Sequence, residues 1–450
     1  MPQTILKYAF FLVSVAVFFS LKAQNFPHPT GIMPYKFESK RIDTAAHWLL
    51  VSPFKLNDKT NATPVPFILD ENGYIAWYWS GATGKLNNDF HYFESAKKFG
   101  WMNIYANGEI YYLFTDAHFK KVDTLKNANS VVPDGHEIQL LANGHYLIGG
   151  KSFRNYDAKN RKFTTEKADS ISILKAEGYM IQEFDADKKL LFQWDSNDHL
   201  VPDKFIDKYD FSLKNFDYCH GNAIAIDQNG DFLVSFRNFD AIYKIRRATG
   251  EVVWKLGGKS NDFRFVNDEG FSGQHHIRIL PNGDISLYDN ATQKPAPQSS
   301  RPVIYRLDTN AMTATKVFDF EQKVFGKSLG SYQNLNDQYH LINYGFIFRP
   351  SPSISLINEK KETIFNLYFA DSVVNYRAQI ADIKDQFARP KIKAKKKKGY
   401  TELSTPKRQS QYLWSNGETT RRIRVREKGS YQVWIPKGIG MIGSQPYHLK

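Results

Sequence analysis

Between residues 72 and 283 the dipeptide Asn-Gly recurs five times, each time just before a short run of alternating apolar residues. The copies are Asn72-Gly73, Asn107-Gly108, Asn143-Gly144, Asn229-Gly230 and Asn282-Gly283. Both residue types accept the positive φ angles of tight hairpin turns, so each copy predicts a β-hairpin. Two further turns, at Ala248–Glu251 and Asn336–Gln338, precede similar strands. The chain is therefore expected to repeat small antiparallel sheets, with no long helical pattern between them.

Repeated small antiparallel sheets are typical of β-propellers, whose blades pack around a central channel. The composition agrees, because 34 Phe and 25 Tyr among 450 residues favour strands. A pair of β-sandwiches is the rival architecture, but it does not require so many similar hairpins. We predict an all-β fold, a six-bladed β-propeller followed by a small C-terminal β-module.

The net charge of +14 first suggests a polyanion-binding protein, but the charge is concentrated in one segment. Residues 389–428 carry 14 Lys and Arg against 3 acidic residues, and the residues before them are close to neutral overall. A nucleic-acid-binding fold, which carries its basic surface on the main domain, is therefore not expected.

The chain divides into four predicted parts. Residues 1–23 contain an apolar run that ends at the small residue Ala23, which is typical of a cleaved secretory signal peptide, although an uncleaved anchor is the alternative. Residues 24–388 form the propeller, 389–399 a flexible basic linker and 400–450 the C-terminal module. Export to the periplasm or the medium follows, without stable membrane insertion. The single cysteine, Cys219, cannot form an intramolecular disulfide.

Three histidines precede predicted strands in similar polar contexts, and they are His136, His220 and His275. If the blades surround one axis, these side chains meet at one mouth of the channel together with Arg237. Neutral imidazole is a nucleophile and proton carrier, and guanidinium binds anionic oxygens, so the set suits sulfuryl or phosphoryl transfer. Two alternatives stay open: a metal site, which the charge of Arg237 disfavours, and ordinary polar residues of the channel wall.

Over residues 100–390 the sequence resembles the bacterial arylsulfotransferases. The resemblance rests on several motifs in the same order, namely Asp134-Gly135-His136, His220-Gly221-Asn222-Ala223-Ile224, Ser235-Phe236-Arg237, Trp254-Lys255-Leu256-Gly257-Gly258, Gln274-His275 and Leu287-Tyr288-Asp289-Asn290. It implies a six-bladed propeller that moves a sulfuryl group from a phenolic sulfate ester to a phenol, without a nucleotide donor, cofactor or metal.

The resemblance also implies roles for individual residues. His275 maps to a nucleophile that is transiently sulfated, while His136, His220 and Arg237 bind the sulfuryl oxygens and one of the histidines moves the phenol proton. Asn222 orients His220. His276 follows His275 directly and competes with it, because neighbouring strand residues point to opposite faces. If neutral imidazole attacks sulfur, the rate is expected to fall below about pH 6.5.

Two rival functions make different predictions. A metal-dependent propeller hydrolase of esters or lactones would lose activity with a chelator. A non-catalytic binding propeller would form no sulfated intermediate.

Overall fold

The computed structural model describes residues 29, 32–39, 48–56, 64–81, 84–105, 109–165, 173–202, 215–296, 298–383 and 388–450. The predicted signal peptide and the Asn107-Gly108 turn lie outside these residues. The regular secondary structure of the described chain is almost entirely β-strand, which confirms the predicted all-β class. The helices described are α1 (Ser196–His199) and the 3-10 turn η3 (Arg237–Phe239). No helix in the described part has the length and apolar character needed to cross a membrane.

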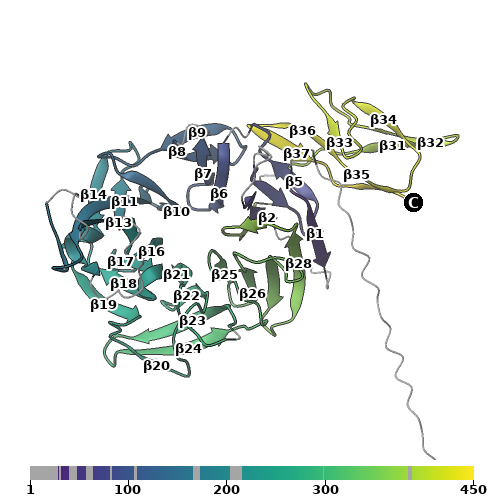
Figure 1. Ribbon diagram of the computed structural model, residues 1–450. Helices are drawn as coiled ribbons and strands as arrows, with labels where there is room; N and C mark the ends of the chain where they lie inside the picture. The colour runs from purple at the N-terminus through teal and green to yellow at the C-terminus, as the bar shows by residue number, and fades with distance from the viewer. Residues whose placement is uncertain are drawn as a thin grey trace, which may run out of the picture.

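Within the described residues, six sheets of at least four strands follow one another around the ring in Figure 1. The sheet that joins both ends of the ring has the order β30 (Gln379–Ala381), β2 (Trp48–Val51), β4 (Phe67–Leu69), β5 (Ile75–Tyr78), β37 (Gly440–Gly443), β36 (Val433–Lys437) and β33 (Leu413–Trp414). The next sheet contains β6 (Gly84–Phe93), β7 (Lys98–Tyr105), β8 (Ile110–Asp116) and β9 (Lys121–Leu125). The third contains β10 (Val132–Leu140), β11 (Tyr146–Asp157), β13 (Ile173–Phe184) and β14 (Leu190–Asp195), with β12 (Lys162–Phe163) and β15 (Asn215–Asp217) beside it.

The remaining three sheets continue the ring in chain order. The fourth contains β16 (Gly221–Ile226), β17 (Phe232–Phe236), β18 (Ala241–Ile245) and β19 (Val252–Gly257). The fifth contains β21 (His275–Ile279), β22 (Ile285–Asp289), β23 (Arg301–Asp308), β24 (Thr313–Asp319) and β20 (Arg264–Val266). The sixth contains β25 (Ser331–Leu335), β26 (Tyr339–Asn343), β27 (Ile354–Asn358), β28 (Thr363–Phe369) and β1 (Tyr35–Ser39). A small pair joins β3 (Pro53–Lys55) to β29 (Val373–Asn375).

The first strands of successive sheets contact one another around the centre. These contacts join β30 to β6, β6 to β10, β10 to β16, β16 to β21 and β21 to β25. Side-chain hydrogen bonds complete the circuit, because Gln333 on β25 donates to the Ile380 carbonyl of β30 (2.9 Å) and accepts from its N–H (2.8 Å). The two ends of the ring are joined by pairing of β2 with β30 and of β1 with β28.

Four of the predicted Asn-Gly turns are confirmed as hairpins, at residues 70–74, 141–145, 227–231 and 280–284, and they share one geometry. In the third, Gly230 donates to the Asp227 carbonyl (3.0 Å) and Asp227 to the Asp231 carbonyl (2.9 Å). Only the glycine has positive φ, +82° at Gly230. This is the three-residue hairpin loop with a glycine bulge, rather than the two-residue loop that needs positive φ at both central positions.

Apolar side chains fill the space between neighbouring sheets. One cluster joins residues of β11, β13 and β14 to residues of β16, β17 and β18, and another joins the fourth sheet to the fifth. The fourth sheet is therefore covered by apolar side chains on both of its faces.

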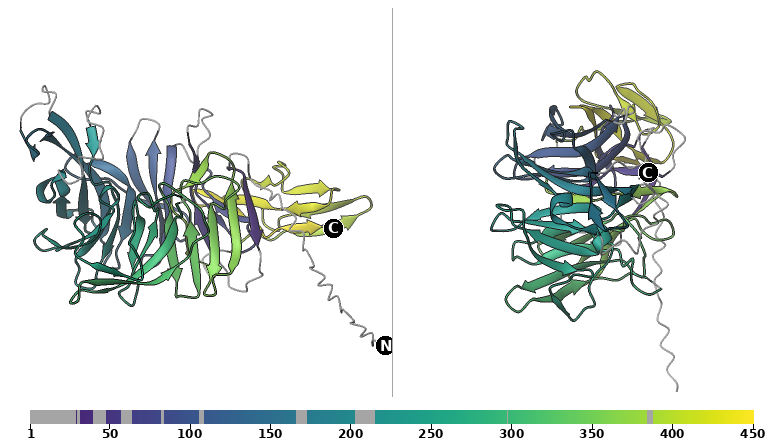
Figure 2. Two further views of the ribbon diagram at one scale, coloured as in Figure 1. Left: turned by 60° about the horizontal axis from the view of Figure 1, so that its bottom comes forward. Right: turned by 60° about the vertical axis from the view of Figure 1, so that its left-hand side comes forward.

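The C-terminal residues extend the first sheet rather than forming a separate body. Strand β37 pairs with β5, with Ile442 opposite Trp77, and the buried Trp434 of β36 donates to the Ile75 carbonyl (3.3 Å). Two further sheets complete the module: β31 (Lys393–Lys397), β32 (Tyr400–Ser404) and β34 (Arg422–Val425), and the pair β35 (Gly429–Tyr431) and β38 (Tyr447–Leu449). Within the segment predicted as a flexible linker, Lys393–Lys397 form β31, because pairing with β32 outweighs the repulsion between lysines. Figure 2 shows the module projecting from the side of the ring.

Because Trp434 is fully buried where the module joins the ring, we expect Trp434→Ala to destabilise the whole protein by about 3 to 5 kcal/mol. Equilibrium unfolding in urea, followed by circular dichroism, measures this loss. Val317→Ala, at a side chain that is 43% exposed, is the control and should change little. A Trp434→Ala cost below about 1 kcal/mol would mean that the module does not share the cooperative unit of the ring.

Candidate functional site

The three candidate histidines lie at the starts of neighbouring central strands, where the ladder to the next strand is interrupted. Register shifts occur between Pro133 and Ile138 in β10, at the start of β16 and between His275 and Arg278 in β21. His220 and His276 have left-handed backbones, with φ of +50° and +55°. Such bulges turn side chains away from the regular alternation and are common beside functional sites.

The structure brings His136 and His220 together as predicted. Their ring centroids are 4.9 Å apart, in an edge-to-face arrangement. Each ring is held by a carboxylate close to it in sequence: His136 Nδ1 lies 2.7 Å from Asp134 Oδ1, and His220 Nδ1 contacts Asp217 Oδ2. Burial raises the pKa of Asp134, but attraction from His136, Lys151 and His220 outweighs it, so this pKa is lowered. A carboxylate therefore holds Nδ1 of each ring and leaves its Nε2 for other partners.

His275 is almost completely buried, and its contacts define its tautomer. Its Nδ1 lies 2.7 Å from Asn290 Oδ1 and 3.0 Å from the Gly273 carbonyl. The Asn290 amide nitrogen donates to the carbonyls of Gly326 (2.7 Å) and Leu329 (3.0 Å), so the Asn290 oxygen is the atom that faces the ring. Both partners of Nδ1 are acceptors, and Nδ1 therefore carries the proton. This leaves Nε2 with its lone pair, the state required of a nucleophile.

Burial, then the charge of Arg237 and those of His136 and His220, lower the pKa of His275 well below its usual value. The strands that carry these residues are neighbours, because β16 contacts both β10 and β21, and β17 also contacts β21. Arg237 begins η3, with its backbone N–H bonded to the His220 carbonyl (3.0 Å) and its guanidinium bonded to Asn238 Oδ1 (3.0 Å) and the Lys327 carbonyl (3.2 Å).

The lowered pKa corrects the expected pH window. In the sulfuryl transfer that the sequence predicts, neutral His275 is the reactive form. Because its folded pKa lies below the ordinary value, the ring stays neutral as the pH falls through about 6.5. We expect the single-turnover rate with 4-nitrophenyl sulfate, whose phenolate leaves without a proton, to stay level at pH 6.5 and to fall only at lower pH. A rate that is halved near pH 6.5 would contradict this prediction.

Asn222 joins the fourth sheet to the fifth. Its buried amide donates to the Gln274 carbonyl (2.8 Å), and its own carbonyl accepts from Arg377 (2.7 Å). These contacts hold the backbone just before His275, at the start of β21. In the described residues, the Asn222 side chain forms no hydrogen bond with His220, the residue that it was predicted to orient.

Sequence reasoning gave no role to Tyr376 and Arg377, which precede β30. The Tyr376 ring lies 5.6 Å from that of His136, and its hydroxyl is 3.3 Å from the His136 carbonyl. Arg377 is buried and bonds to Asp89 Oδ2 (3.1 Å) and Glu137 Oε2 (3.2 Å). No local pattern in the sequence identifies the partners of these two residues, because their partners lie far away along the chain.

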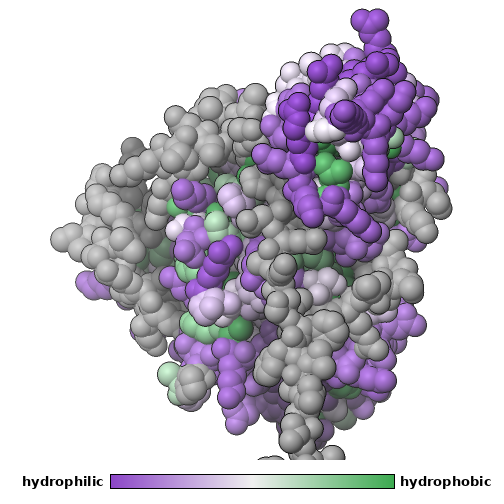
Figure 3. All heavy atoms as spheres, turned by 90° about the vertical axis from the view of Figure 1, so that its right-hand side faces the viewer, coloured by the Kyte–Doolittle hydropathy of each residue, from purple (hydrophilic) through white to green (hydrophobic). Residues whose placement is uncertain are grey.

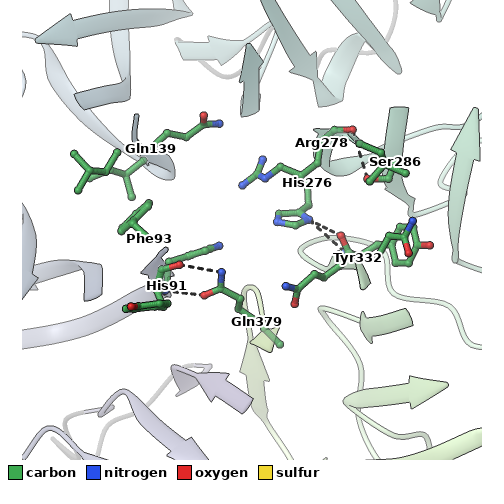
Figure 4. Close-up of a pocket in the computed structure, with 15 residues that line it drawn as sticks. His91, Phe93, Gln139, His276, Arg278, Ser286, Tyr332 and Gln379 are labelled. Atoms are coloured by element: carbon green, nitrogen blue, oxygen red, sulfur yellow. Dashed lines mark hydrogen bonds between the residues drawn. The ribbon is translucent and has the colours of Figure 1, made fainter. Parts of the chain in front are cut away.

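His276 lies in a different place from His275. It lines a cavity of about 330 Å³ with His91, Arg278 and Gln139, and its Nδ1 lies 3.0 Å from the Tyr332 carbonyl (Figure 4). His136, His220 and His275 do not line this cavity. The bulge in β21 therefore separates the two neighbouring imidazoles, and only His275 is coupled to His136, His220 and Arg237.

The sequence also raised the possibility of a metal site and contains one cysteine. In the described residues, no group of three or more His, Cys, Asp or Glu side chains is placed to hold a metal ion. Cys219 is buried and carries a free thiol.

A family model described as "Arylsulfotransferase (ASST)" matches residues 98–349. This match spans more than half of the chain and includes His136, His220, Arg237 and His275. The chain belongs to the arylsulfotransferase family.

Curated proteins and solved structures give less information. No curated protein matches the chain. A protein of unknown function from Bacteroides caccae is 11% identical, with a TM-score of 0.46, and the match covers 75% of this chain and 100% of that one. A putative 6-phosphogluconolactonase from Bacteroides fragilis is also 11% identical, with a TM-score of 0.39 and coverage of 76% and 100%. A virginiamycin B lyase from Staphylococcus aureus is 12% identical, with a TM-score of 0.31 and coverage of 74% and 99%. These likenesses are too distant to support an argument about function.

Proposed function

We propose that this protein is an exported aryl-sulfate sulfotransferase that works through a sulfated His275, on a six-bladed β-propeller whose blades are the six ring sheets. Its substrates are a phenolic sulfate ester as donor and a phenol as acceptor, and it needs no nucleotide, cofactor or metal. The observation that supports the proposal is the fixed tautomer of His275, which leaves the Nε2 lone pair available on a buried ring whose pKa is lowered by burial and by the charge of Arg237.

In the first half-reaction, His275 Nε2 attacks the sulfur of the donor. An N–S bond forms, and the bond from sulfur to the phenolic oxygen breaks with its electron pair on that oxygen. His136 or His220, each held by a carboxylate, donates a proton to the departing phenolate. The sulfuryl oxygens carry negative charge in the transition state, and the permanent cation Arg237 stabilises them.

In the second half-reaction, a phenol replaces the first product. The imidazole that lost its proton removes the phenol proton, and the phenolic oxygen attacks sulfur. The N–S bond breaks with its electron pair on Nε2, which restores neutral His275. Asn290 keeps the Nδ1 proton in place throughout, so the departing nitrogen regains the original tautomer.

The test is a donor-alone reaction followed by an acceptor. Mixing the purified protein with 4-nitrophenyl sulfate should release one equivalent of nitrophenol and add about 80 Da to the intact mass, with peptide mapping to His275. Adding a phenol should remove this mass and start steady turnover. Turnover that ignores the acceptor and stops with a chelator would identify a metal-dependent hydrolase, and no turnover with any aryl sulfate would leave a binding propeller.

Export is part of the same proposal, since the predicted signal peptide is its support. The protein secreted from cells is expected to begin at Gln24, which N-terminal mass analysis measures. If the protein from cells still contains residues 1–23, this segment is an uncleaved membrane anchor and not a signal peptide.

A further inference from the structure

One face of a sheet in the C-terminal module is basic. Residues directly opposite each other in an antiparallel pair lie on the same face. Three lysines of β31 lie on one face, where Lys393 is opposite Ser404, Lys395 opposite Glu402 and Lys397 opposite Tyr400 of β32. On the other side of β32, Ser404 is opposite Arg422 of β34, and Glu402 is opposite Arg424. We call the five cations Lys393, Lys395, Lys397, Arg422 and Arg424 the basic face.

The opposite face of the same sheet is apolar and packed. Leu403, Ile423 and Val425 are buried in one cluster with Trp414 and Tyr412. Side chains alternate along a strand, so burying the apolar set requires the five cations to point outward. The basic face is therefore fixed by the core of the module and is not a chance gathering of mobile side chains.

The charge of the basic face is not neutralised by the protein. Among the described residues, no carboxylate forms an ion pair with any of the five cations, and Glu402 is the one acidic side chain on this face of the sheet. The ring, by contrast, is close to electrically neutral. Figure 3 shows strongly hydrophilic side chains over the module.

We propose that the basic face binds a linear anionic polysaccharide, one that carries sulfate or carboxylate groups along its length. Successive lysines of β31 are separated by about 6.7 Å along the strand, and β31 and β34 lie about 9.6 Å apart. The cations therefore form two parallel rows on a flat surface, which can contact an extended polyanion at several points.

The surface favours a polysaccharide over a membrane or a nucleic acid. No large apolar side chain is exposed in residues 389–450, so nothing is available to enter the hydrocarbon boundary of a bilayer. Stacking of bases requires an aromatic face, and the Tyr400 ring is already covered by the Arg424 guanidinium, 5.4 Å from its centroid.

Protection of exposed strand edges is the competing explanation for these lysines, because β31 and β34 are the two edges of the sheet. Charges of either sign give that protection, and it does not explain why all five side chains are cations. The module lies outside the ring in Figure 1, so a polymer bound there leaves the centre of the ring open. This proposal does not depend on the sulfotransferase reaction.

The experiment measures binding of fluorescein-labelled dextran sulfate to the mature protein by anisotropy, at several salt concentrations. With five contacts, affinity should fall about 100-fold between about 50 and about 200 mM salt. The variant Lys393→Gln/Lys395→Gln/Lys397→Gln should bind more weakly at low salt and lose less than about 10-fold over the same range. Uncharged dextran should not bind.

A control variant removes the same charge from the ring. Lys97→Gln/Lys189→Gln/Lys360→Gln changes three exposed lysines and should bind dextran sulfate like the unaltered protein. Equal weakening by both variants would overturn the proposal in favour of a net-charge effect. Equal or tighter binding to phosphatidylglycerol vesicles or to single-stranded DNA would overturn the choice of polysaccharide, and no binding to any polyanion would leave edge protection alone.

Discussion

Replacing His275 with alanine is expected to lower turnover of an aryl sulfate at least about 1,000-fold, because the variant lacks the nucleophile that we propose forms the covalent intermediate. Steady-state release of nitrophenol with a phenol acceptor measures the loss. The intact-mass increase should disappear at the same time. Since the imidazole is buried, a melting curve must show that the variant remains folded.

Two companion variants make this result specific. His276→Ala changes the neighbouring imidazole, which lines the separate cavity, and should keep turnover within about 10-fold of the original. Asn290→Ala removes the acceptor that fixes the Nδ1 proton and should reduce kcat by about 10- to 100-fold while sulfation of His275 still occurs. If His276→Ala were the inactive variant, the assignment of the nucleophile would move to His276.

The hairpins and the histidine cluster could be predicted because both depend on local sequence. Asn-Gly turns depend on the φ of one glycine, and four of them are found where expected. His136 and His220 each precede a central strand, and a ring architecture is enough to bring such positions together. The choice between His275 and His276 could not be made, since it depends on a bulge that breaks the two-residue alternation on which the sequence argument relied.

Long-range partners could not be predicted in the same way. Arg377 is paired with Asp89, 288 residues earlier, and no local pattern connects them. The lysine-rich segment was interpreted from charge repulsion alone, but backbone pairing with β32 and an exposed position for every side chain make a strand stable there. Likewise, the pairing of β37 with β5 depends on which sheet edge is open, and sequence composition does not contain that information.

The pH dependence of the rate also depends on the folded environment of His275 as well as on the residue type. An isolated imidazole gives a pKa near its ordinary value, and the residue type alone therefore predicted loss of rate below about pH 6.5. Burial and the charge of Arg237 belong to the folded environment, and they move the pKa of His275 downward.

Glu137→Gln is expected to destabilise the protein by about 3 to 5 kcal/mol, because it leaves Arg278 without its carboxylate partner and the buried Arg377 with Asp89 alone. Glu137 is buried and holds Arg278 through two hydrogen bonds of 3.0 and 3.1 Å, and Arg377 through one of 3.2 Å. With Asp89, the network contains two acids and two arginines. Removing one acid leaves two cations against one anion at the centre of the ring.

Urea unfolding followed by tryptophan fluorescence measures this cost, and two further variants interpret it. Glu109→Gln breaks the exposed pair with Lys126 and should cost less than about 1 kcal/mol. The double variant Glu137→Gln/Arg278→Gln restores the balance of charge and should be more stable than Glu137→Gln alone, which is the sign of a direct coupling. A Glu137→Gln cost as small as that of Glu109→Gln would show that water reaches the network and screens its charges. The central strands would then be held in place by packing between sheets, and the positions of Tyr376 and Asn222 beside the histidines would not depend on this ion network.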